Sequence, residues 1–141
     1  MKETKTILLN SRPKGKPESS DFKFETEQVT ELESGQVLLS AKYVSVDPYL
    51  RGRMSDAKSY IAPFEIGKPI ASAIIAEVVE SKADKLKKGD HVSGLLDWKE
   101  FQVASADKLM KVDKEKAPLS AYLGILGMTG LTAYLGLTEI G

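Results

Sequence analysis

The sequence has no cysteine and a single histidine among its 141 residues. The absence of cysteine excludes disulfide bonds, thiolate metal sites and a cysteine nucleophile. His91 stands in a turn-to-strand step, and one histidine with scattered carboxylates rarely forms a set of metal ligands. We therefore expect His91 to be a structural or surface residue, and we predict no metal site. No nucleophile elbow accompanies it for a Ser–His–acid triad.

No charge sign is in excess, because 20 acidic residues balance 20 basic residues. Such a balance gives no overall field to attract nucleic acid or an anionic membrane. The sequence also lacks an apolar run of about 18 residues, the length that suggests a membrane span. Its first ten residues do not form a secretory signal. These absences favour a cytoplasmic protein that binds neither nucleic acid nor membrane.

A glycine-rich nucleotide fingerprint is missing as well. Gly124, Gly127 and Gly130 are spaced by three residues, which matches neither a Walker motif nor the Gly-x-Gly-x-x-Gly pattern. We interpret these glycines as sites of close helix packing or of a bend.

What the sequence does contain predicts a mainly β fold. Short apolar or alternating stretches predict strands over residues 6–9, 22–29, 36–46, 70–79, 91–96, 100–104 and 108–112. Many short strands separated by turn signals are typical of a small barrel or sandwich. Residues 120–138 instead repeat apolar side chains at helical spacing, and predict one helix, or two bent at Gly127 or Gly130.

The segment from Val46 to Met54 predicts a short helix after a strand. Asp47 is a favourable N-cap and Pro48 is tolerated at the first helical position. Tyr49 and Arg51 are then candidates to face a cleft. The composition alone favours a plainer interpretation, in which Asp47 caps, Tyr49 packs and the arginines lie in solvent.

The segment from Gly127 to Tyr134 places Met128 and Thr132 on one helix face, at positions i and i+4. A flexible apolar side chain beside a hydroxyl is a plausible wall for a flat heteroaromatic ring. The alternative, which periodicity alone favours, is a core face whose Thr132 hydroxyl bonds back to a carbonyl. Tyr60 and Trp98 lie in predicted loops, where each can line a ligand pocket or close the end of a barrel.

Together these two segments resemble one family. Val46 to Arg51 and Gly127 to Tyr134 are similar to the hallmarks of the leukotriene B4 dehydrogenase, prostaglandin reductase and plant double-bond reductase group. This group is a zinc-independent branch of the medium-chain dehydrogenases/reductases. Further similarity extends over nearly the whole chain, through residues 6–13, 59–64, 77–82 and 88–90.

The resemblance implies a fold, a reaction and a cofactor. The fold is a GroES-like, partly open β-barrel with short helices, over residues 1–118. Residues 119–141 would form the helical start of a link to an absent Rossmann domain. The reaction is the NADPH-dependent reduction of the C=C bond of an α,β-unsaturated ketone or aldehyde, in which the enzyme holds nicotinamide and enone together and stabilises a developing oxyanion.

The resemblance also implies roles for individual residues. Pro48 and Tyr49 would flank the cofactor cleft, and Met128 and Thr132 would lie near the nicotinamide. Tyr60 would reach the substrate, and Trp98 would lie at the edge of the pocket. The stretch from Ala71 to Ala73 departs from a family pattern that often carries glycine there.

The family's glycine-rich phosphate loop and its substrate tyrosine of the second domain do not occur in the chain. We therefore expect no catalytic residue in this chain, and a fragment that neither binds NADPH tightly nor turns over. The full-length protein would bind a small enone or quinone and form a homodimer. A quinone reductase of the same superfamily and a non-catalytic GroES-like binding module are the alternatives that the sequence leaves open.

Overall fold

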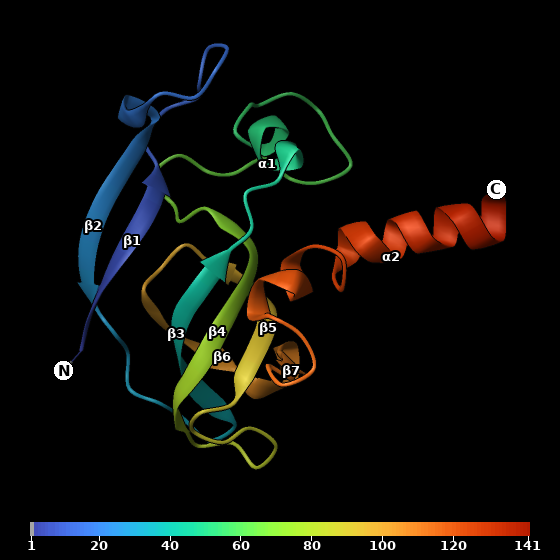
Figure 1. The fold of residues 1–141 in the computed structure, drawn as a ribbon. Coiled ribbons are helices and arrows are strands. Elements are labelled where there is room, and N and C mark those ends of the chain that lie inside the picture. The colour runs from blue at the N-terminus through green and yellow to red at the C-terminus, as the bar shows by residue number, and fades with distance from the viewer. Residues whose placement is uncertain (1) are drawn as a thin grey trace.

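The computed structural model describes residues 2–141 and shows two antiparallel sheets with a helical arm (Figure 1). The smaller sheet pairs β1 with β2, and the larger has the strand order β6-β3-β4-β5-β7. The strands are β1 (Glu3–Leu9), β2 (Phe22–Gln28), β3 (Gln36–Val44), β4 (Ala71–Ser81), β5 (His91–Asp97), β6 (Phe101–Ser105) and β7 (Met110–Val112). The predicted mainly β architecture and all seven predicted strands are thus confirmed, with shifted ends.

The longest strand, β4, lies at the centre of the larger sheet. Ile74, Ile75 and Val78 of this strand are completely buried. One hydrophobic core forms where β4 packs with β3 and β5, and it includes Val37, Leu39 and Val92. Burial of each such aliphatic side chain stabilises the fold by about 1.5–3 kcal/mol. The prediction of a buried strand from the apolar, β-branched residues of this stretch is thus confirmed.

A second hydrophobic core supports the short helix α1 (Pro48–Arg53). The residues that form it are Leu9, Leu50, Met54, Phe64 and Ile70. They come from β1, from α1 and its C-cap Met54, from the loop 55–69, which runs around α1 in Figure 1, and from Ile70 just before β4. This core therefore attaches α1 and its loop to the end of the smaller sheet.

Residues around Trp98 join the two sheets. The backbone N–H of Ile7 donates to Trp98 O over 2.9 Å, and the backbone N–H of Trp98 donates to Ile70 O over 2.7 Å. Isolated bridges also pair Thr6 with Lys99 and Leu8 with Pro69. These bonds wrap β1 towards the turn between β5 and β6, and they curl the sheets into a partly open barrel.

The helical arm consists of three pieces. They are the 3-10 helix η3 (Leu119–Leu123), the α-helix α2 (Met128–Leu135) and a π-helical turn η4 (Gly136–Ile140) that continues α2. The chain bends between η3 and α2, with Gly127 at the N-cap of α2. η3 packs near β4, whereas α2 projects away from the sheets (Figure 1).

Gly127 and Gly130 permit the close backbone packing at the bend before α2. A Cβ atom at Gly130 would lie 1.7 Å from the backbone oxygen of Ile125, and one at Gly127 would lie 2.6 Å from the backbone oxygen of Tyr122. Real side chains do not tolerate such contacts, so both positions require glycine. A Cβ at Gly124 would lie 3.9 Å from the backbone oxygen of Ala121, which is an ordinary contact. The interpretation as sites of close packing or of a bend is therefore confirmed for Gly127 and Gly130, and not for Gly124.

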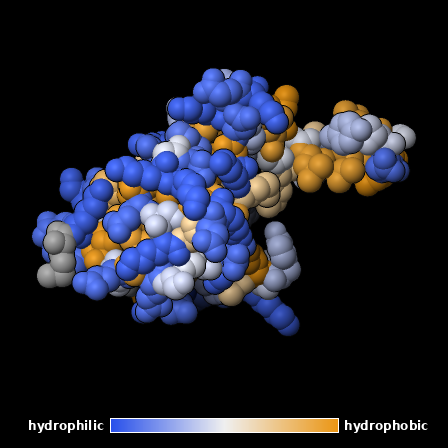
Figure 2. Space-filling view, turned by 90° about the horizontal axis from the view of Figure 1, so that it is seen from below, coloured by the Kyte–Doolittle hydropathy of each residue, from blue (hydrophilic) through white to orange (hydrophobic). Residues whose placement is uncertain are grey.

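The arm presents apolar side chains to solvent. Met128, Leu137 and Ile140 are each about four-fifths exposed. Figure 2 shows hydrophobic side chains gathered on the projecting arm. No helix in residues 2–141 is both long enough and apolar enough to cross a membrane.

Candidate functional site

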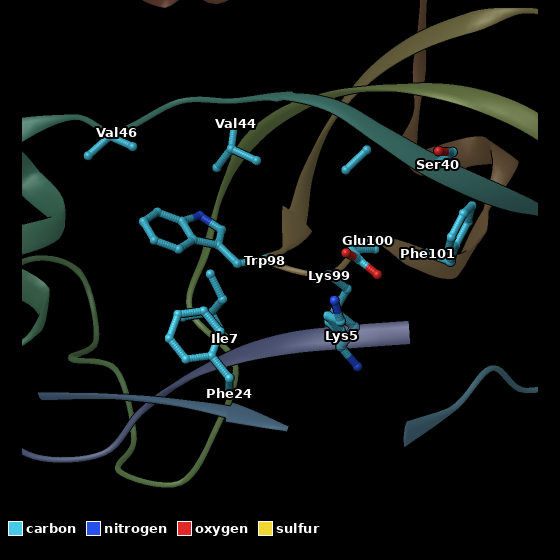
Figure 3. A pocket seen from close by; sticks show the side chains of 11 residues that line it. Lys5, Ile7, Phe24, Ser40, Val44, Val46, Trp98, Lys99, Glu100 and Phe101 are labelled. Carbon is cyan, nitrogen blue, oxygen red and sulfur yellow. The ribbon is translucent and has the colours of Figure 1, made fainter. Parts of the chain in front are cut away.

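An apolar cavity of about 640 Å³ opens between the smaller sheet and β3. Ile7 and Phe24 line it from β1 and β2, Val44 from the end of β3, Val46 from the segment just after β3, and Trp98 from the turn between β5 and β6 (Figure 3). Ligand pockets generally have such apolar walls and a few polar groups. This cavity is therefore large and apolar enough for a small organic molecule.

A buried hydrogen bond holds the indole ring of Trp98. Its Nε1–H donates to the Oγ of Ser72 over 2.8 Å, and Ser72 is completely buried in β4. The same ring packs against both hydrophobic cores. Trp98 is thus a wall of the cavity that is also held by contacts with both hydrophobic cores, and its contact with a ligand stays a prediction.

The other end of the cavity is charged. Lys5, Lys99 and Glu100 line it there. The Nζ of Lys99 lies 2.7 Å from the Oε1 of Glu27, which also accepts a bond of 2.8 Å from the buried Thr6 hydroxyl. The hydrogen bond from Lys99, followed by that from Thr6, lowers the pKa of Glu27 below its usual value. Lys99 is therefore paired with a carboxylate.

Helix α1 begins as the sequence predicts, with Asp47 at the N-cap and Pro48 in the first turn. The Asp47 carboxylate, however, makes no capping bond to the helix backbone. It accepts a 2.5 Å hydrogen bond from the hydroxyl of Ser45, which is buried. Ser45 thus orients Asp47 just before the helix. Pro48 and Tyr49 are on its exposed side, and Tyr49 retains 39% of its surface.

The arginines of α1 do not lie free in solvent, and that expectation is wrong. Both are half-buried. Arg51 donates from Nε to Gly15 O and from Nη2 to Pro13 O, each over 2.9 Å. Arg53 donates from Nε to Ala62 O over 3.0 Å. No periodic pattern indicates these bonds, because they join the helix to loops outside it.

Tyr60 and the α2 residues lie on exposed segments. Tyr60 is 95% exposed in the loop 55–69, and Met128 is 82% exposed at the start of α2. The Thr132 hydroxyl donates to Met128 O over 2.7 Å, which is the back-bond that periodicity suggested. Met128 and Thr132 do lie one helical turn apart, but their face is exposed and is not part of a core.

The structure does not bring the six predicted site residues into one pocket. Trp98 lines the apolar cavity, whereas Tyr60, Tyr49 and Met128 do not. Within residues 2–141, no group of three or more potential ligands is placed to hold a metal ion. His91 is half-buried and lines a surface depression together with Asp90 and Lys111.

Comparison with known proteins identifies a family that this chain matches. Residues 5–112 match the family described as the N-terminal domain of oxidoreductase. YfmJ of Bacillus subtilis, which is named as an NADP-dependent oxidoreductase, is 56% identical over 135 residues, which are 96% of this chain and 40% of YfmJ. The NADPH-dependent curcumin reductase of Escherichia coli is 42% identical over 95% of this chain and 39% of its own length.

A solved structure shows the same fold. The crystal structure of CurA from Vibrio vulnificus superposes with a TM-score of 0.89 at 33% sequence identity, and this similarity covers 96% of this chain and 40% of CurA. The structure of CurA in complex with NADPH gives a TM-score of 0.87. These likenesses confirm the predicted GroES-like architecture. The chain spans about 40% of the length of the relatives that it matches.

Proposed function

The chain belongs to the family of N-terminal oxidoreductase domains of the medium-chain reductases, and from this premise we propose that it is the substrate-binding part of an NADPH-dependent reductase. The reaction proposed is reduction of the C=C bond of an α,β-unsaturated ketone or aldehyde. The observation that carries this proposal is the 56% identity to an NADP-dependent oxidoreductase along nearly the whole chain. The 42% identity to a curcumin reductase supports the choice of an enone.

The residues of this chain fit the nicotinamide end of the cofactor. Thr132 donates its proton to Met128 O, so its oxygen keeps lone pairs that can accept a bond from an amide N–H. Met128 adds a flexible, exposed apolar side chain beside it. Pro48 and Tyr49 would form the opposite wall. The sequence has no glycine-rich phosphate loop, so the phosphates would be held by a second domain.

The cofactor would supply a hydride to the β-carbon of the substrate. The task of this chain is to orient the enone and to exclude water around it. Tyr60 carries a phenolic O–H that can donate a hydrogen bond to the substrate carbonyl and so help to orient the enone. The exposed apolar face of α2 would be covered when the second domain is in place. No catalytic residue is assigned to the chain itself.

A chimera tests the proposal. Residues 1–141 would replace the matching part of Escherichia coli curcumin reductase, and NADPH consumption would be followed with curcumin and, separately, with a simple quinone. We expect the chimera to reduce curcumin and this chain alone to consume no NADPH. The intact reductase is the positive control.

Each other outcome has a definite meaning. A folded chimera that binds NADPH and reduces neither compound contradicts the proposal and favours a binding module. Reduction of the quinone alone replaces the enone by a quinone. Turnover by this chain alone overturns the expectation that it is inactive.

A further inference from the structure

The arginines of this sequence, Arg12, Arg51 and Arg53, all converge on α1 and on the two loops beside it. The guanidinium of Arg12 connects two points that border one loop. Its Nη1 donates to Met54 O over 3.0 Å, and its Nη2 donates to Phe64 O over 3.3 Å. One side chain from outside the loop therefore ties the residue before the loop to a residue near its end.

Arg53 closes the same loop from the helix side. Its Nε donates to Ala62 O over 3.0 Å, and its Cζ lies 3.9 Å from the centroid of the Phe64 ring. The backbone oxygen of Arg53 also accepts a bond of 2.7 Å from the N–H of Phe64. Phe64 itself is only 5% exposed within the second core. These contacts make a neck, formed by Arg12, Arg53, Met54, Ala62 and Phe64.

The tip of the loop is held differently. Within the described residues 2–141, no hydrogen bond involves a backbone group of residues 56–61. Tyr60 lies in this tip and is 95% exposed. A closed neck with an unbonded tip is the architecture of an Ω-loop, whose ends are close together and whose surface often carries function.

We infer that Arg12 and Arg53 are positioning residues, which close the neck of the loop 55–69 and thereby present Tyr60 to the substrate. The inference rests on the proposed function for the substrate, and on the structure for the neck. Lysine cannot replace either arginine, because its ammonium lacks the planar fork with which Arg12 bonds two carbonyls and the planar group with which Arg53 stacks on Phe64. The neck limits where Tyr60 can go, and the free tip lets it adjust to a bound molecule.

The first test uses this chain alone, without cofactor or substrate. Lys58 lies in the tip and is a cleavage site for trypsin. In Arg53→Met and Arg12→Lys we expect cleavage after Lys58 to accelerate roughly tenfold, because each change removes at least one hydrogen bond from a charged donor at the neck. Exchange of the Phe64 amide proton should accelerate as well, since this proton forms the backbone bond of the neck.

Arg51→Met is the matched control. Arg51 lies on the same helix and also bonds two carbonyls, but it holds the loop of Pro13 and Gly15. We expect this variant to accelerate cleavage after Lys14 and to leave cleavage after Lys58 unchanged. The emission of Trp98 in urea checks that each variant is folded, and Arg12→Lys serves if Arg53→Met is not.

The inference is overturned if folded Arg12→Lys keeps both Lys58 cleavage and Phe64 exchange within about twofold of the parent, the range of an ordinary surface change. In the curcumin reductase chimera, Arg53→Lys should raise the KM for curcumin and leave the KM for NADPH unchanged. An equal rise in both KM values contradicts a positioning role. If the chimera folds and binds NADPH but reduces neither compound, the proposed function fails, and cleavage and exchange still decide whether the neck exists.

Discussion

Replacement of Ser72 by alanine tests how the cavity wall is built. Ser72 is completely buried, and its Oγ accepts the indole N–H of Trp98 over 2.8 Å. The change to alanine leaves the backbone of β4 intact and removes only the acceptor. A buried indole N–H that is left without an acceptor lowers the free energy of unfolding by about 1–3 kcal/mol. Because Trp98 is only half-buried, we expect Ser72→Ala to lower the free energy of unfolding by about 1–2 kcal/mol.

A double-mutant cycle separates the hydrogen bond from other effects. Trp98→Phe removes the donor and also leaves a gap, so its cost should exceed that of Ser72→Ala. When both changes are combined, neither group is left without its partner. We therefore expect the double variant to be more stable than the sum of the single changes predicts, by about 1 kcal/mol.

Urea denaturation followed by circular dichroism gives the free energy of unfolding of the parent, the two single variants and the double variant. Circular dichroism is suitable because its signal does not depend on Trp98, which two of the variants lack. Ser40→Ala is the matched control, since Ser40 also lines the cavity and is half-buried. It should change stability by less than about 0.5 kcal/mol. A coupling energy below about 0.3 kcal/mol, which is the error of additivity, refutes the account of a hydrogen-bonded wall.

Two further predictions concern α2 and the acid range. Gly130→Ala should disrupt the start of α2, because its Cβ would lie 1.7 Å from the backbone oxygen of Ile125. Gly136→Ala is the control, because its Cβ would enter open space. Amide exchange along α2 should therefore accelerate in Gly130→Ala and not in Gly136→Ala. Hydrogen bonds from lysines lower the pKa values of Asp90 and Glu27 below the ordinary 3.8 and 4.5. Both groups thus stabilise the fold above these values, and urea midpoints should decrease as the pH falls through the lowered pKa values, less so in Glu27→Gln.

The hydrophobic pattern was sufficient to predict the strands, and the reason is local. In β4, a run of β-branched residues signals a strand that is buried on both faces, and Ile74 and Ile75 are indeed buried. The back-bond from Thr132 to Met128 was also predictable, because it joins residues one helical turn apart. Signals of this kind need only the residues of a single element.

The contacts that shape the site could not be predicted in this way. Arg12 bonds residues 42 and 52 positions away, and Trp98 bonds Ser72 across 26 positions. No periodicity records such pairs, because their spacing depends on how the sheets and loops are folded. The departure of the stretch from Ala71 to Ala73 from the family's pattern was visible, but the bond from Trp98 to Ser72 within that stretch was not.

The residues with proposed roles and the residues that support them differ in physical character. Tyr60 and Met128 are almost fully exposed, whereas Phe64 and Leu50, which anchor the same region, are almost fully buried. Burial leaves a pattern in the sequence, since apolar residues must recur at the period of their element. Exposure leaves none, so only resemblance to a family could single out the exposed residues. A site made of exposed residues on separate elements becomes specific when buried anchors limit their positions, and this is the role that the arginine neck supplies for Tyr60.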